Sequence, residues 1–276
     1  MPDMLEVAKC AALAGAQVLR EHAGRIENVR TKSSSSDLVT EVDIASGAAV
    51  VRAIAAAVPG ARFVVEEPES YALAGVEPGS LADPEVWVID PLDGTTSYVH
   101  GYPCYSVSVA LLREGAPVAA AVYNAASGEM NAAAVGRGAT LDGRPLRATD
   151  ASEIEQALLI TGFPYDRTVT LDRQLAVFTR LIRRVHGIRR DGSAAIDCCH
   201  VAAGRADGFW EFALKPWDTA AGALIALEAG ALVTDFAGAA WSPETTDTLV
   251  ANPVLHGVML EAIASYLEEA GFADLG

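Results

Sequence analysis

The sequence predicts a layered α/β protein, an α+β sandwich rather than a simple doubly wound sheet. In the first half of the chain, short runs of β-branched and aromatic residues are separated by glycine and proline turns. In the second half, runs of strand length alternate with longer helical patterns. The 276 residues contain no convincing repeat and no long linker. We therefore expect the halves 1–148 and 149–276 to pack as a single unit, 1–276.

The first half should begin with helices and continue as strands. An alanine-rich helix is expected over 4–22, and a second over about 41–58 because Pro59-Gly60 follows it. Apolar runs bounded by turn residues then predict strands. These runs are RFVVEEPES, which is expected to be a short strand that runs into an acidic loop, VWVI, SVSVALLR, PVAAAVYN and GEMNAAAVGRGATLDGRPL, with a loop expected over 77–84.

The second half should alternate strands and helices. Strands are expected in ALLITGF, GFWEFAL and ALVTD. Helices are expected near 171–185, 194–204, 218–229 and the C-terminus.

Composition and charge exclude several classes of function. The chain is 51% hydrophobic, and its 20 Lys and Arg against 36 Asp and Glu give a formal net charge of −16. Such a surface repels nucleic-acid phosphates and anionic lipid. The acidic N-terminus does not resemble a signal peptide, and the most apolar run, TAAGALIALEAGALVTD, is too short to span a bilayer. We expect a soluble, cytoplasmic protein.

The four cysteines do not predict a metal site or a disulfide framework. They are Cys10, Cys104, Cys198 and Cys199, and no C-x-x-C occurs. Cys198, Cys199 and His200 are adjacent in a predicted helix, where neighbouring side chains diverge, so we expect reduced cysteines that pack in the core.

The strand VWVI runs directly into Asp90 and Asp93, and Pro91 turns the chain between them. Two carboxylates aimed at one point repel each other unless a proton or a cation lies between them. Oxygen ligands favour Mg²⁺, Mn²⁺ or Ca²⁺ over zinc. Gly94 and Thr95 then offer backbone amides that could cradle a phosphate. The alternative is a simple turn closed by aspartate hydrogen bonds.

Three further acidic positions could complete such a site, although each has a structural alternative. Glu66 follows a predicted strand, where a solvated loop is the alternative. Asp218 and Asp43 stand at the starts of predicted helices, where an acidic residue is most simply a cap.

Four segments together resemble the inositol monophosphatase family. WVIDPLDGTTSYVHGYP resembles its first signature and PWDTAAGALIALEAG its second. KSSSSDLVTEVD, which contains Lys32, and GRGATLDGRPL are similar to two further family segments. They occur in the family's order over about 30–235. The resemblance implies the αβαβα architecture of the inositol monophosphatase and fructose 1,6-bisphosphatase superfamily and Mg²⁺-dependent phosphomonoester hydrolysis.

The resemblance also implies a metal site with two to three Mg²⁺ ions, for which Mn²⁺ could substitute and which Li⁺ would inhibit. Glu66, Asp90 and the carbonyl of Leu92 would hold the first ion. Asp90, Asp93 and Asp218 would hold the second, and Glu66 would support the third.

The catalytic residues implied are Glu66, Thr95 and Asp43, with the Thr95 hydroxyl, paired with Asp43, beside the attacking water. The amides of Gly94 and Thr95 would receive the phosphate. The family is commonly homodimeric, so we expect a homodimer. The N-terminal half would carry the metal and phosphate site, and the C-terminal half the specificity elements.

On the alcohol side, the resemblance implies substrate contacts from Gly192, Ser193, Ala194, Glu211, Asp93 and Asp218. As a substrate contact, Glu211 favours inositol 1-phosphate or a similar polyol phosphate. The alternative is that Glu211 has no role in binding and is simply an exposed residue on a strand. Histidinol phosphate, fructose 1,6-bisphosphate, NADP and 3′-phosphoadenosine 5′-phosphate are alternative substrates. Arg189 and Arg190 could meet a second phosphate, but we expect them to be solvated.

Five positions depart from the family's pattern, of which Ser97 and Tyr98, in place of the common Asn and Phe, are not expected to touch the implied ligands. Val65 and Pro68 flank the two glutamates where G-E-E-S is common, which puts the third ion in question, and Asp142 replaces a usual Asn. No implied ligand is missing, which argues against a non-catalytic, metal-dependent ligand sensor.

Overall fold

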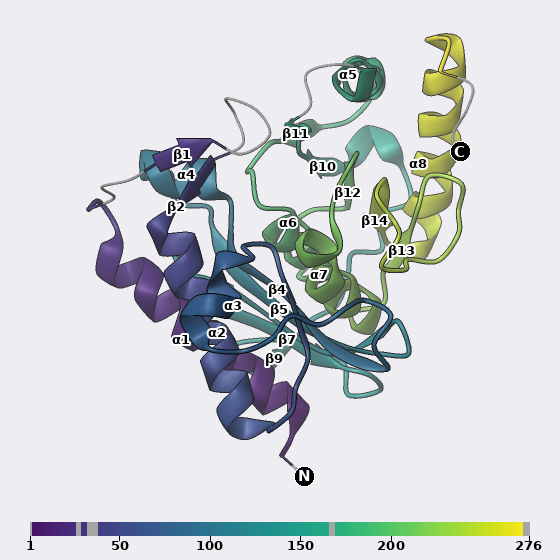
Figure 1. Cartoon of the computed structure of the whole chain (residues 1–276). Coiled ribbons are helices and arrows are strands. Elements are labelled where there is room, and N and C mark those ends of the chain that lie inside the picture. The colour runs from purple at the N-terminus through teal and green to yellow at the C-terminus, as the bar shows by residue number, and fades with distance from the viewer. Residues whose placement is uncertain (1, 26–28, 32–37, 166–168, 273–276) are drawn as a thin grey trace.

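The computed structural model describes residues 2–25, 29–31, 38–165 and 169–272. These residues form layers in the order helix, sheet, helix, sheet, helix (Figure 1). The predicted αβαβα architecture is therefore confirmed.

The first layer consists of α1 (Met4–His22) and α2 (Glu41–Ala57). Asp3 caps α1 by accepting the Leu5 amide at 3.0 Å, and Thr40 caps α2 by accepting the Val42 amide at 3.1 Å. Alanine and valine dominate their buried faces and allow both helices to lie flat on the first sheet. Both helices were predicted within one residue of their observed ends.

The first sheet has seven strands within the described residues, and only β3 and β4 are parallel neighbours. Its order is β3 (Phe63–Val65), β4 (Glu85–Asp93), β5 (Ser106–Arg113), β6 (Ala116–Asn124), β7 (Glu129–Ala134), β8 (Ala139–Leu141) and β9 (Arg144–Pro145). Side chains of β4 alternate between two cores: Trp87 and Ile89 face α1 and α2, whereas Val86 and Val88 face the middle helices. The β4–β5 pairing is irregular between Asp90 and Asp93.

The middle layer consists of α6 (Ala194–Ala202) and α7 (Pro216–Glu228), and its residues share a core with both sheets. Cys198 and Cys199 are buried in this layer as free thiols. The expectation of core cysteines is confirmed.

The second sheet has five strands among the residues described, and α5 (Val169–Leu181) and α8 (Pro253–Glu269) cover its outer face (Figure 1). Its order is β11 (Gly187–Arg189), β10 (Leu158–Thr161), β12 (Gly208–Glu211), β14 (Thr248–Ala251) and β13 (Leu232–Thr234). β10 lies between β11 and β12 and is parallel to both. The carboxyl ends of these three strands therefore meet at one edge of the sheet.

Several short elements were not predicted, because three to six residues are too few to show a periodicity. They are β1 (Val29–Thr31), β2 (Leu38–Thr40), α3 (Glu69–Ala74), α4 (Thr95–His100), η1 (Ile154–Gln156), β11 and β14. The short strand expected at the start of RFVVEEPES is β3, but α3 begins at Glu69, where only an acidic loop was expected.

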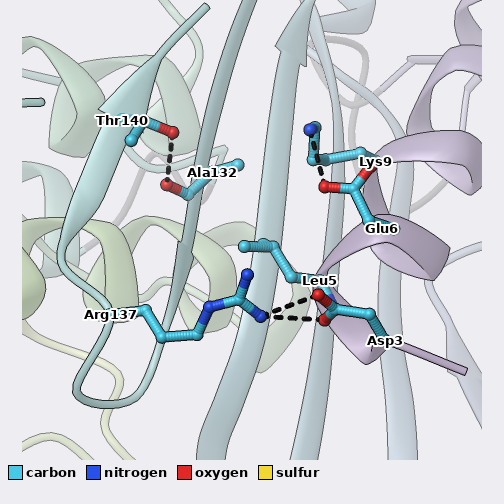
Figure 2. A network of polar contacts seen from close by, with 7 residues as sticks. All are labelled: Asp3, Leu5, Glu6, Lys9, Ala132, Arg137 and Thr140. Carbon is cyan, nitrogen blue, oxygen red and sulfur yellow. Dashed lines mark hydrogen bonds and ion pairs between the residues drawn. The ribbon is translucent and has the colours of Figure 1, made fainter. Parts of the chain in front are cut away.

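A surface contact joins the start of α1 to the turn between β7 and β8. Arg137 donates two hydrogen bonds to the carboxylate of Asp3, at 2.9 and 2.8 Å, and Lys9 pairs with Glu6 at 2.9 Å (Figure 2). Both pairs are exposed, so each contributes only about 0–1 kcal/mol. The Arg137–Asp3 pair links the start of α1 to the β7–β8 turn, whereas the Lys9–Glu6 pair lies within α1 itself.

Across the residues whose structure is described, no helix is both long and apolar enough to cross a membrane.

Candidate active site

Two carboxylates, those of Asp90 and Asp93, lie at the end of β4 in a turn that is held by hydrogen bonds. Asp90 is 2% exposed and Asp93 is 9% exposed. The Leu92 amide donates to Asp90 Oδ1 at 3.0 Å, and the Ser46 hydroxyl of α2 donates to the Pro91 carbonyl at 2.8 Å. Asp90 does form a turn hydrogen bond, but its burial beside other acids is not explained by a simple surface turn.

Gly94 is required by both conformation and space. Its φ of +92° lies in the left-handed region, and a Cβ there would lie 2.8 Å from the Cys104 carbonyl oxygen and 3.2 Å from that of Gly192. Glycine therefore lets the turn after β4 approach the loop before α6, and α4 begins at Thr95.

Thr95 and Asp43 are in contact, although they come from different elements. The Thr95 hydroxyl lies 3.1 Å from Asp43 Oδ1 and 3.1 Å from the Leu92 carbonyl oxygen. Asp43 Oδ2 accepts the Thr40 amide at 2.9 Å and the Thr40 hydroxyl at 2.5 Å. Asp43 is thus the third residue of α2, in a capping box, and its other oxygen reaches Thr95. Burial raises the pKa of Asp43 to about 6.

Asp93 is held by the start of α6. Its Oδ2 accepts the Ser193 hydroxyl at 2.6 Å and the Ala195 amide at 2.9 Å. The positive end of the helix favours the carboxylate. Burial nevertheless raises the pKa of Asp93 to about 6, so desolvation outweighs these hydrogen bonds.

Asp218 is not the N-cap of α7. Lys215 holds that position, and its amide donates to Asp218 Oδ2 at 2.7 Å. Pro216 starts the helix because it needs no amide partner there. Asp218 is therefore the third residue of α7. Its Oδ2 accepts the amide of the N-cap residue, and its other carboxylate oxygen is available to the site. Burial and the charges of Glu66 and Asp93 raise its pKa.

The acidic residues affect one another strongly. The pKa of Asp90 lies well above its ordinary value, mainly because of burial. Three neighbouring charges add to the effect: Glu66, Asp93 and Asp218. A cluster of buried carboxylates of this kind must bind protons or cations to offset its negative charge.

These residues fit divalent cations in donor type and in charge, since buried carboxylates and a backbone carbonyl are the oxygen ligands that Mg²⁺ prefers. Within the described part of the chain, no three His, Cys, Asp or Glu side chains already form a metal-ligand cluster.

A pocket of about 410 Å³ opens beside the carboxylates. Of the predicted site residues, it is lined by Glu66, Asp93, Gly192, Ala194, Glu211 and Asp218. The others do not line it: Asp43, Asp90, Leu92, Gly94, Thr95 and Ser193. Ser193 instead binds Asp93.

Most of the remaining lining of this pocket was not predicted from the sequence. The added residues are Gly162, Phe163, Pro164, Tyr165, Phe212, Ala213, Leu214, Lys215 and Trp217, and Arg190, which we expected to be solvated, also lines the pocket. Most of them directly follow β10, β11 or β12, so a correct prediction of these parallel strands would have indicated them.

On the alcohol side, the structure excludes the alternative for Glu211. Glu211 is 9% exposed at the end of β12 and lines the pocket, so it is not an exposed strand position. Burial and the charge of Asp93 raise its pKa to about 8, although Arg190 opposes the shift. Arg190 is exposed but lines the pocket, whereas Arg189 does not. Lys32 and the serines after it lie outside the described residues.

The chain is similar to known proteins over most of its length. The model of the inositol monophosphatase family matches residues 1–271. The chain is 37% identical over 261 residues to an inositol-1-monophosphatase of Synechocystis, covering 95% of this chain and 88% of that protein. It is 38% identical over 271 residues to the Nus factor SuhB of Pseudomonas aeruginosa, covering 97% and 98%.

Solved structures show the same likeness. An inositol monophosphatase from Anabaena superposes with a TM-score of 0.82 at 36% identity, covering 95% of each chain. An IMPase from Thermotoga maritima gives 0.87 at 31% identity, covering 98% of this chain and 100% of that one. Together with the matching family model, they show that the chain belongs to the inositol monophosphatase family and is a phosphatase.

Proposed function

We propose that this protein hydrolyses monophosphate esters of small polyols, with inositol 1-phosphate as the preferred substrate and Mg²⁺ as cofactor. The observation that carries the proposal is the pocket itself. Its lining combines Glu66, Asp93 and Asp218, which suit cations that would in turn bind phosphate, with Glu211, which suits hydroxyl groups.

The residues that would hold two to three Mg²⁺ ions are Glu66, Asp90, Asp93, Asp218 and the Leu92 carbonyl. Bound divalent cations neutralise phosphate charge and make a water molecule more acidic. Mn²⁺ would substitute and Li⁺ would inhibit, as the family resemblance implies. Val65 and Pro68 beside Glu66 leave two ions as the better supported number.

Thr95 and Asp43 would orient the attacking water. When the Thr95 hydroxyl donates its proton to Asp43 Oδ1 over 3.1 Å, its oxygen can accept a hydrogen bond from the water. The first amides of α4, from Gly94 and Thr95, have no helical acceptor of their own and would receive a phosphate oxygen.

On the alcohol side, Glu211 would accept hydrogen bonds from substrate hydroxyls, with Gly192 and Ala194 in the adjoining wall. Ser193 would act indirectly, because its hydroxyl holds Asp93 at 2.6 Å. Arg190 and Lys215 also line the pocket and would favour an ester with a second anionic group. For this reason the alternative substrates that carry more than one phosphate group are included in the substrate panel.

The test is phosphate release by the purified protein, with Mg²⁺ or with EDTA. The panel is inositol 1-phosphate, histidinol phosphate, fructose 1,6-bisphosphate, 3′-phosphoadenosine 5′-phosphate and NADP. We expect release that EDTA abolishes and that is fastest for inositol 1-phosphate. Release from none of the esters in Mg²⁺ would contradict the proposal and favour a ligand sensor.

Asp93→Asn should remove most of the activity, because one carboxylate ligand and its charge are lost. Steady-state phosphate release measures this, and circular dichroism checks the fold. Near-normal turnover by a folded variant would contradict the assignment of Asp93.

Some relatives carry the name Nus factor. For this chain the net charge of −16 opposes direct contact with nucleic-acid phosphates, so we retain a small phosphate ester as the partner. A homodimer and a cytoplasmic location also remain part of the proposal. Light scattering in solution tests the dimer.

A further inference from the structure

Gly162 and Glu211 are in unusually close contact at the pocket wall. Gly162 directly follows β10, and Glu211 ends the neighbouring strand β12. A Cβ built on Gly162 would lie 2.1 Å from Oε1 and 2.1 Å from Oε2 of Glu211. No side chain fits within that distance, so the carboxylate rests against bare backbone.

A buried network fixes the backbone at Gly162. Gln174 of α5 donates to the Gly162 carbonyl oxygen at 2.7 Å and to the Thr161 hydroxyl at 2.7 Å. Thr161 in turn donates to the Trp210 carbonyl oxygen at 2.6 Å, one residue before Glu211. Thr161 and Gln174 are fully buried. The ends of β10 and β12 are thereby tied to each other and to α5.

Steric contact, more than hydrogen bonding, determines where the Glu211 carboxylate lies. Among the residues that the structure describes, its oxygens have no hydrogen bond to another protein group. They lie at the wall of the pocket and against Gly162. A larger residue at 162 must therefore push the carboxylate away from this wall.

We propose that Gly162 is a positioning residue for substrate selection. Its missing side chain lets the Glu211 carboxylate stand back from the pocket, and the Gln174–Thr161 network holds the wall in place. This inference rests on the proposed function, in which Glu211 accepts hydrogen bonds from the hydroxyls of a polyol phosphate. A carboxylate displaced into the pocket would occupy the place of the alcohol.

The substitution Gly162→Ala tests this role without a large effect on folding. The φ of Gly162 lies outside the left-handed region, so alanine brings no backbone strain there. The atoms that must move are the free end of a flexible side chain. A matched control is Gly187→Ala in the adjacent strand β11, where the nearest contact of a Cβ would be 3.4 Å, to Arg189 Nη1.

The experiment compares inositol 1-phosphate with p-nitrophenyl phosphate, an ester without polyol hydroxyls, in Mg²⁺. Gly162→Ala should lower kcat/KM for inositol 1-phosphate by about tenfold or more, mainly through KM, and leave the aryl ester within about twofold. Gly187→Ala should change neither.

A double-mutant cycle with Glu211→Ala isolates the contact. In the Glu211→Ala background, Gly162→Ala should have no further effect, because the carboxylate it would displace is absent. If Gly162→Ala fails to fold, Thr161→Val provides a second variant, with a smaller rise in KM for the polyol ester only.

An unchanged KM in Gly162→Ala, an equal loss on both esters, or full additivity in the cycle would each overturn the positioning role. In all three cases the wild type remains an active phosphatase. Wild-type protein that cleaves neither ester in Mg²⁺ would instead overturn the proposed function, and this inference with it.

Discussion

Single residues in this site serve the backbone and the chemistry at the same time. Asp43 and Asp218 each give one carboxylate oxygen to a capping box, at 2.9 and 2.7 Å from a backbone amide. A carboxylate has two oxygens, so the other remains available: in Asp43 it meets Thr95. The structural and the functional interpretations of these residues are therefore not alternatives.

At this scale, Thr95→Val should lower kcat by about 100-fold and change KM little, because the hydroxyl between Asp43 and the attacking water is lost. Thr96→Val is the matched control: Thr96 is the next residue and is exposed. Steady-state kinetics on inositol 1-phosphate separates the two parameters. Equal kinetics of the two variants would contradict the role of Thr95.

Among the elements, the middle helices connect the two sides of the site. α6 presents Ser193 and Ala195 to Asp93, and α7 carries Asp218. The two helices are closely packed, since a Cβ on Gly222 of α7 would lie 2.6 Å from the Cβ of Cys198 in α6. Glycine at position 222 therefore lets the two helices approach closely at this point.

Gly222→Ala should destabilise the protein, since overpacking costs about 1–3 kcal/mol and alanine regains only about 1 kcal/mol of helix propensity. Gly257→Ala in α8 is the matched control. A Cβ there meets nothing within 4 Å, so this variant should gain up to about 1 kcal/mol. Denaturant unfolding measures both changes. A stabilised Gly222→Ala would contradict the close packing.

Across the whole molecule, folding concentrates buried acids that the unfolded chain would leave in water. The folded pKa is about 6 for Asp43 and Asp93 and about 8 for Glu211. Each lies above the unfolded value of about 4. The folded state therefore binds more protons in this range, and its stability falls as the pH rises through these values.

In EDTA, the melting temperature should accordingly fall between about pH 5 and about pH 8. Mg²⁺ binds the deprotonated carboxylates of the folded state, so it should raise the melting temperature more at the higher pH. Calorimetry with and without Mg²⁺ measures both effects. A melting temperature that rises with pH in EDTA, or that does not change when Mg²⁺ is added, would contradict this account.

Long elements and specific motifs were predictable from the chain alone. The periodicity of 4–22 and 41–58 and the strand before Asp90 depend on local residue pattern, and each was observed close to its predicted place. The acidic site residues were also named from local motifs. The single catalytic unit with halves 1–148 and 149–276 stays a prediction, although the pocket draws residues from both ranges.

The family and the layered fold could be predicted from the chain alone, and the site acids could be named as candidates, because strand and helix patterns and long motifs are local properties. The burial of Glu211, the hydrogen bond from Ser193 to Asp93 and the contact of Gly162 with Glu211 became visible only in the folded structure. These contacts join residues 49 to 100 positions apart. Their geometry follows from how parallel strand ends and helix starts pack, and no single stretch of sequence contains that information.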